Sequence, residues 1–361
     1  MHKFVTAFFL TASATALSAA ELTTAAAPGA VAPAIPTKPF AVADAEAVIP
    51  ALATALEANY VIPETGKKYA AAIRARFASG AYRRFATDMD FAKAVTIDLQ
   101  SVARDGHLKL FTPEMVAQIK SRKQRPDGTA ENFIEKSGWL APGVAYISFT
   151  MFSGSDQEIA DIRQFLSAHA DAKTLILDVR KHRGGGMDEM DVIFAQLFAK
   201  PTDLLELDTR AAVDGHDASG SQDYATLFKV AAPAGVVRRL HRAIPAAQPT
   251  GLSAAKVFVL TSSHSASAAE HFALALKRTG RATLIGETTR GAGNYGQPFP
   301  LPGGYAAFIP FGRTFDPATG EGWEGTGVKP DVAVPAGAAL EEALKLAGAK
   351  TTAQVALATL K

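Results

Sequence analysis

The hydrophobic and polar positions of this 361-residue chain first follow a helical pattern. Between residues 43 and 105, alanine and leucine alternate with charged residues, and β-branched residues are few. The pattern predicts a small helical domain over residues 40–106, with helices from Asp44 to Asn59, from Lys67 to Ser79 and from Asp88 to Arg104. Pro50 lies inside the first helix and should kink or restart it.

The pattern then changes to short apolar segments, rich in β-branched residues, that alternate with helical ones. Strands are predicted at residues 108–111, 144–149, 174–179, 255–260 and 282–286, with helices at 157–170, at 188–198 and after Ser267. This alternation predicts an α/β core with mostly parallel pairing over residues 107–348, with active sites at the carboxyl ends of strands. Residues 205–250 have no clear period and are expected to cross the core as a long excursion, which could face a substrate as a lid.

The two ends of the chain differ from this core. Residues 1–20 have a short basic start, an apolar stretch and small residues, the pattern of a cleaved signal peptide. Residues 21–39 are mainly alanine, proline and threonine and predict a disordered linker, whereas residues 349–361 are expected to form a tail or a helix. We therefore expect an exported protein, periplasmic or secreted. No segment reaches the ~20 apolar residues of a membrane span, so no integral span is expected.

Composition excludes several classes of function. The chain is 48% hydrophobic and 20% charged, as globular proteins are. Its 37 Lys and Arg against 35 Asp and Glu give a net charge of +2, and no basic run contains aromatic residues, so no nucleic-acid partner is expected. The absence of cysteine excludes disulfides, thiolate catalysis and zinc-thiolate sites. Nothing in the sequence indicates the oligomeric state.

Serines cluster where an apolar strand runs into a helix, in the segment TSSHSASAAE at residues 261–270. A serine at such a junction is exposed at the sheet edge, among free helix amides that can stabilise an oxyanion. The junction is therefore a candidate site for a nucleophile. Ser267 and Glu270 also fit a capping box, which would simply close the end of the helix.

Three glycines, Gly184 to Gly186, follow the buried strand at 174–179 and let backbone amides approach a ligand closely. A flexible turn explains them equally well. A phosphate cradle is disfavoured, because the lysine and hydroxyl pair of a P-loop is missing. The run GAGNYG at residues 291–296 formally matches a dinucleotide fingerprint, but Pro298 and Pro300 follow it instead of a helix, so we reject that site.

His107 lies where the helical region meets the first strand and could face a cleft as a general base. Glu324 lies among glycines and could orient a histidine. The ordinary alternatives are a surface or hydrogen-bonded core histidine and a solvated turn acid. His182 and His264, within the two motifs above, compete for the role of the base.

Taken in order, these segments resemble the S41 peptidase family, which includes C-terminal processing proteases, tricorn-type proteases and interphotoreceptor retinoid-binding repeats. The family patterns D-x-R-x-N-x-G-G, S-A-S-A-S-E, G-R-A-x-x-x-G-E and G-V-x-P-D are similar to residues 178–185, 265–270, 280–287 and 327–331. His182 stands where asparagine is usual, and Ala269 replaces the last serine. The nucleophile of the family falls on Ser267, and the resemblance runs from about residue 44 to 345.

Two departures indicate which branch of the family the chain is similar to. The serine-lysine branch carries its base five residues after the glutamate of G-E, and that position is Ala292 here. Tricorn-type members use a histidine ahead of the core and a distal glutamate, roles that fall on His107 and Glu324. Only 71 positions separate His107 from Asp178, too few for the PDZ module that the lysine branch usually carries.

The resemblance implies a crotonase-like α/β core behind an N-terminal helical domain, and a serine endopeptidase that acts on peptides or proteins without a metal or organic cofactor. His107 would take the proton of Ser267, and Glu324 would hold the imidazole. The amide of Ala268 and that of Gly184 or Gly185 would bind the oxyanion. A non-catalytic binding protein for peptides or apolar ligands, and an esterase for small acyl substrates, stay open as alternatives.

Overall fold

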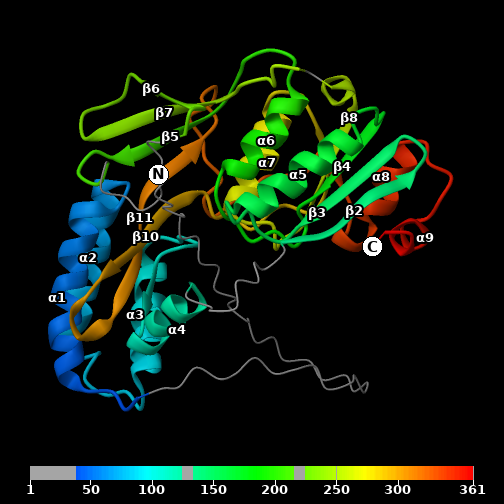
Figure 1. The fold of residues 1–361 in the computed structure, drawn as a ribbon. Helices are drawn as coiled ribbons and strands as arrows, with labels where there is room; N and C mark the ends of the chain where they lie inside the picture. The colour runs from blue at the N-terminus through cyan, green and yellow to red at the C-terminus, as the bar shows by residue number, and fades with distance from the viewer. Residues whose placement is uncertain (1–37, 124–132, 215–223, 249, 361) are drawn as a thin grey trace, which may run out of the picture.

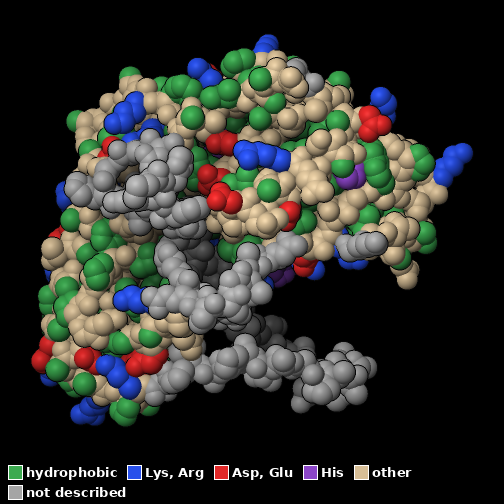
Figure 2. Space-filling view, viewed as in Figure 1, with side chains coloured by type: hydrophobic (Ala, Val, Ile, Leu, Met, Phe, Trp, Pro, Cys, Tyr) green, Lys and Arg blue, Asp and Glu red, His purple; other side chains and the backbone are tan. Residues whose placement is uncertain are grey.

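The computed structural model describes residues 38–123, 133–214, 224–248 and 250–360 (Figure 1). The predicted signal peptide and residues 21–37 of the predicted linker lie outside these ranges. Within them, no helix is long and apolar enough to cross a membrane. On the face shown in Figure 2, acidic and basic side chains are interspersed with hydrophobic ones, and neither sign forms a continuous field.

Three helices open the described chain: α1 (Val42–Asn59), α2 (Pro63–Ala78) and α3 (Asp88–Val102). Their bounds agree with the predicted helices to within a few residues, although α1 continues through Pro50 and does not restart there. Their buried side chains share one core with Leu110, Ala307 and Ile309, which belong to the strands β1 and β11 described below. The helical region therefore packs directly on a sheet, as Figure 1 shows for the blue helices and the orange strands.

The α/β core is built on a six-stranded sheet in the order β12-β9-β8-β4-β3-β2. Its strands are β2 (Ile134–Ala141), β3 (Val144–Phe149), β4 (Thr174–Asp178), β8 (Lys256–Thr261), β9 (Thr283–Gly286) and β12 (Val332–Ala333). All neighbours pair in parallel except β2 with β3, as the alternating pattern predicted. Asp178 pairs with Leu260, so β4 and β8 end at the same edge of the sheet.

Helices cover both faces of this sheet (Figure 1). One face packs α5 (Asp156–Ala168), α6 (Asp188–Leu197) and α7 (Ala268–Arg278) against a core that includes Leu177 and Val259. The other packs α8 (Ala339–Leu346) and α9 (Ala353–Ala358) against Ile176 and Phe258. Because alternate residues enter different cores, these strands are apolar throughout and not alternating. The helix α9 lies within the segment 349–361 that was expected to be a tail or a helix.

A second, antiparallel sheet has the order β1-β11-β5-β7-β6, and β10 also pairs with β11. Its strands are β1 (Lys109–Phe111), β5 (Thr202–Arg210), β6 (Leu227–Val230), β7 (Val236–Ala243), β10 (Asn294–Pro300) and β11 (Ala306–Phe315). The helix α4 (Pro113–Lys123) follows β1. The complete arrangement is a mixed α/β fold preceded by a helical region, which confirms the predicted fold class.

The prediction for residues 205–250 was wrong, because β5, β6 and β7 in this range are paired strands and not a loose excursion. Charged side chains at buried and half-buried positions conceal the strand pattern in the sequence. Arg238 forms an ion pair with Asp208 at 2.6 Å, and the buried Arg239 forms one with Asp214 at 2.7 Å. A hydropathy pattern counts these residues as exposed, whereas their partners allow them to be half-buried or buried. Residues 215–223 and 249 lie outside the described ranges.

Candidate active site

Ser267 occupies the sharp turn between β8 and α7. Its backbone has φ 57° and ψ −117°, and among the non-glycine residues that the structure describes it alone has a positive φ. Such a conformation costs about 1–3 kcal/mol and persists only where the surroundings enforce it. The Ser267 amide donates to Glu270 Oε2 at 2.8 Å, so the glutamate reaches back as the capping box predicts.

Glu270 is fully buried and fixes this turn to a second loop. Its carboxylate also accepts hydrogen bonds from the amides of Gly291 and Ala292, at 2.6 and 2.8 Å, and from the hydroxyl of Thr289 at 2.6 Å. Burial raises the pKa of Glu270, and these hydrogen bonds oppose that rise. Sequence reasoning treated Glu270 as a helix cap only, because its partners lie about twenty residues further along the chain.

The other serines of the cluster have structural hydrogen bonds. Ser265 Oγ donates to the carbonyl of Val179 at 2.7 Å and accepts from the amide of Ser262 at 2.9 Å. The Ser262 hydroxyl donates to the carbonyl of Arg180. These two hydroxyls therefore join the end of β8 to the segment that follows β4, whereas Ser263 is exposed.

The glycine turn after β4 packs directly against Ser267. Gly184 and Gly185 have φ of 118° and 137°, where a side chain is strained. A Cβ on Gly184 would lie 3.0 Å from the Cβ of Ser267, and one on Gly185 would lie 1.9 Å from the carbonyl oxygen of Phe152. Glycine is required at both positions for the backbone to approach the serine this closely.

Two amides near Ser267 are free to bind a ligand. The amide of Gly184 donates to His182 Nδ1 at 3.1 Å, so it is already engaged. The amides of Gly185 and Ala268 donate to no acceptor in the described ranges. Both residues line the same cavity as Ser267. Unpaired N–H groups beside a serine hydroxyl are the kind of donor that stabilises an oxyanion.

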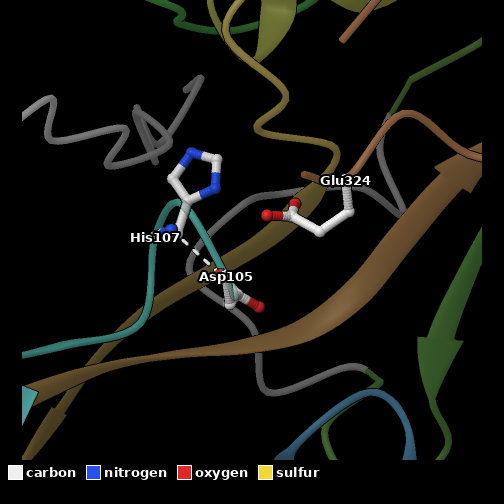
Figure 3. Close-up of side chains that lie close together, drawn as sticks. All are labelled: Asp105, His107 and Glu324. Atoms are coloured by element: carbon white, nitrogen blue, oxygen red, sulfur yellow. Dashed lines mark hydrogen bonds between the residues drawn. The ribbon is translucent and has the colours of Figure 1, made fainter. Parts of the chain in front are cut away.

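His107 forms a second cluster with Asp105 and Glu324 (Figure 3). One ligand atom from each of the three residues lies within 4.8 Å of the others, and the carboxyl group of Glu324 points toward the imidazole. The His107 ring is buried and stacks on Phe308, with centroids 5.6 Å apart. Its Nδ1 is buried and has no hydrogen-bond partner in the described part of the chain.

Glu324 is held by backbone amides and not by the histidine. It accepts hydrogen bonds from Gly106 at 2.7 Å, Gly293 at 2.7 Å and Asn294 at 2.8 Å. Burial, together with the carboxylate of Asp105, raises the pKa of Glu324 to about 8. Burial lowers the pKa of His107 to about 4, although Asp105 opposes this shift. At neutral pH the imidazole is therefore unprotonated, as a general base must be.

The spacing of this cluster would also suit a metal ion, but the hydrogen bonds of Asp105 favour another role. Its Oδ1 accepts from the amides of His107 and Leu108, at 2.9 and 3.1 Å. Its Oδ2 accepts from the hydroxyl of Tyr60 at 2.8 Å and from the side-chain Nδ2 of Asn294 at 2.9 Å. Both lone pairs of each oxygen are thus occupied, so Asp105 is built to orient the His107 loop.

Two residues, Ala292 and Asn294, link the surroundings of Ser267 to the cluster of His107, Asp105 and Glu324. The amide of Ala292 donates to the carboxylate of Glu270. Ala292 also packs against Gly106, where an added Cβ would lie 3.2 Å from the Ala292 Cβ. Asn294 lines the cavity of Ser267 and also donates to Asp105. The His107 Nδ1 makes no hydrogen bond to the Ser267 hydroxyl.

The competing histidines lie elsewhere. His182 is completely buried behind the glycine turn, and burial lowers its pKa to about 3. His264 lines a different cavity, together with Asp178 and Arg180. Sequence reasoning missed Asp105, although its position two residues before a candidate base is a signal that could have found it.

The chain matches two known sequence families. Residues 143–334 match peptidase family S41, and residues 42–141 match the N-terminal domain of S41 peptidases in eukaryotic IRBP. The first match spans more than half of the chain. The chain is therefore a hydrolase of the S41 serine peptidase family.

Solved structures are similar over most of the chain. A putative peptidase from Parabacteroides merdae has a TM-score of 0.56 and 18% identity, over 88% of this chain and 96% of that one. The photosystem II D1 C-terminal processing protease has a TM-score of 0.50 and 16% identity, over 80% and 92%. A lipoprotein from Streptococcus agalactiae has a TM-score of 0.52 and 15% identity, over 82% and 93%. At these identities the likeness concerns the fold alone.

Proposed function

We propose that this chain is an exported serine endopeptidase that hydrolyses peptide bonds through an acyl-enzyme on Ser267. The observation that carries the proposal is the strained backbone of Ser267 beside two free amides, those of Gly185 and Ala268. Strain of this kind is retained at functional sites, and unpaired amides beside a serine can donate to an oxyanion. A helix cap alone would require neither feature.

In the proposed reaction, Ser267 Oγ attacks the substrate carbonyl and its proton passes to the His107 imidazole. The resulting oxyanion accepts hydrogen bonds from the amides of Gly185 and Ala268. The imidazolium then gives the proton to the leaving amine as the C–N bond breaks. Water repeats the sequence on the acyl-enzyme, and the ionised carboxylate of Glu324 stabilises the imidazolium in both halves.

Cleavage of internally quenched peptides by the purified protein tests this function. We expect hydrolysis by the wild type, none by Ser267→Ala, and ordinary rates for Ser263→Ala, because Ser263 is an exposed serine of the same turn. Hydrolysis of small esters without cleavage of peptides would favour an esterase. Peptide binding without turnover would contradict the proposal and favour a binding protein.

Export rests on the pattern of residues 1–20, with its basic start, apolar stretch and small residues. The test is expression of the full chain in a bacterial host, followed by fractionation and N-terminal sequencing. We expect a product in the periplasm or medium that begins near residue 21. A cytoplasmic product that retains Met1 would contradict this part of the proposal.

A further inference from the structure

A series of hydrogen-bonded side chains leads from the half-buried Asp191 to the cavity beside Ser267. His241 Nε2 lies 2.8 Å from Asp191 Oδ1, and His241 Nδ1 lies 2.8 Å from His271 Nε2. His271 lies on α7, one turn after Ser267, and both residues line a cavity of about 60 Å³. Asp191 Oδ2 also accepts from the hydroxyl of Thr226 at 2.6 Å, and this hydrogen bond holds the Asp191 carboxylate in place.

The hydrogen bonds along this series of side chains determine whether His271 offers a donor or an acceptor to the cavity. A carboxylate only accepts, so Asp191 requires the proton of His241 on Nε2. When Nδ1 of His241 carries no second proton, it accepts from the N–H at Nε2 of His271. This leaves a lone pair on His271 Nδ1, which makes no hydrogen bond within the described ranges. Burial lowers the pKa of His271 well below its usual value, in agreement with a neutral ring.

Trp323, which also lines this cavity, carries an unused donor. Trp323 Nε1 is buried and has no hydrogen-bond partner in the part of the chain that the structure describes. The rings of Trp323 and His271 meet edge to face, with centroids 6.4 Å apart. The remaining lining is largely apolar and includes Met187, Met190 and Leu207. A buried donor without a partner is costly, and the neighbouring His271 offers an unused lone pair, so the cavity is suited to a group that satisfies both.

We infer that this cavity binds the substrate side chain next to the attacked carbonyl, and that it selects neutral side chains bearing a hydroxyl or a carboxamide. Such a tip donates to His271 Nδ1 and accepts from the indole N–H of Trp323. A carboxylate has no proton for His271, an ammonium has no lone pair for Trp323, and either charge would be desolvated among methionines. Purely apolar side chains leave both groups unpaired. The inference rests on the proposed function, because it assigns the subsite of the same nucleophile.

The test compares peptides that differ only in the residue before the cleaved bond, in the pairs Thr and Val, and Gln and Met. Members of a pair are similar in size, so the ratio of their kcat/KM reports the hydrogen bonds. We expect the wild type to prefer Thr over Val, and Gln over Met, by about tenfold or more. In His271→Leu both ratios should fall severalfold, because only the hydrogen bond from Trp323 remains. His271→Asn is the matched control, since its side-chain oxygen can replace Nδ1 as an acceptor and retain part of the preference.

Asp191→Asn tests the relay behind His271, because the amide can donate to His241 and reverse the direction of both hydrogen bonds. His271 Nδ1 would then become a donor, and the preferences should fall although His271 is intact. A merely structural role would lower kcat/KM equally for both members of a pair. Thermal unfolding verifies that each variant is folded.

Labelling of the wild type by a fluorophosphonate separates the two levels of the proposal. If the labelled enzyme prefers Val and Met, or if His271→Leu keeps the preference of the wild type, the proposed subsite is wrong. The proposed peptidase function would not be affected by either result. An enzyme that is neither labelled nor active would overturn both.

Discussion

The carboxylate of Glu270 offers a quantitative test of how the turn at Ser267 is held. Glu270→Ala removes the acceptor of three buried amides, those of Ser267, Gly291 and Ala292. Each buried donor left without a partner costs about 1–3 kcal/mol, so the variant should lose about 3–9 kcal/mol of unfolding free energy. The hydroxyl of Thr289 can rotate to another acceptor and adds little.

Glu270→Gln should be milder for a geometrical reason. Its remaining oxygen can serve the Ser267 and Ala292 amides, while its NH₂ group donates to the Thr289 hydroxyl. Only the amide of Gly291 then loses its acceptor, and the expected loss is about 1–3 kcal/mol. Urea denaturation at neutral pH measures both values. Glu46→Ala, at an exposed position of α1, is the control and should stay within about 0.5 kcal/mol of the wild type.

The functional consequence follows from the strained backbone of Ser267. Without Glu270 the turn can relax to an ordinary conformation, and the rate of fluorophosphonate labelling should fall by about 10²-fold or more in Glu270→Ala. The reasoning would be refuted if Glu270→Ala lost less than 1 kcal/mol, or if it lost stability but was labelled at the rate of the wild type.

Three further outcomes are expected. Gly184→Ala should slow labelling about 10- to 100-fold, because its Cβ would press on Ser267. Gly235 also has a positive φ but has open space around it, so Gly235→Ala should not slow labelling. Equal rates in the two variants would contradict the packing argument. Ser267→Gly should be more stable than Ser267→Ala by about 1 kcal/mol in denaturation, since glycine relieves the positive φ, and equal stability would show that the turn is unstrained. The kcat/KM should rise with pH through about 8, because the Glu324 carboxyl is protonated below that pH and only its ionised form stabilises the imidazolium. Glu324→Gln should abolish this rise, and a pH profile that is the same in both would exclude Glu324 as the titrating group.

Much of the fold follows from local pattern. The helices of residues 42–102 and the parallel strands β3, β4, β8 and β9 agree with the predicted segments, because their apolar residues fall at one clear period or form short buried runs. The hydropathy pattern does not predict the antiparallel sheet. Its strand β7 buries Arg239 and His241, which are stable only next to Asp214 and Asp191.

Some features of the candidate site can likewise be predicted from local sequence, and others depend on the folded structure. Ser267 and the glycine turn lie at strand ends, where sequence alone can locate them. The engagement of the Gly184 amide by His182 depends on the folded turn, and it makes Gly185 the free donor. The relay to His271 joins α6, β7 and α7, and no spacing in the sequence predicts that these side chains meet.

The central claim is that Ser267 is the nucleophile, and site mapping of a fluorophosphonate adduct by mass spectrometry tests it most directly. The account predicts one adduct, on Ser267, which is lost in Ser267→Ala and retained in Ser263→Ala. An adduct on another serine, or labelling that persists in Ser267→Ala, would contradict it.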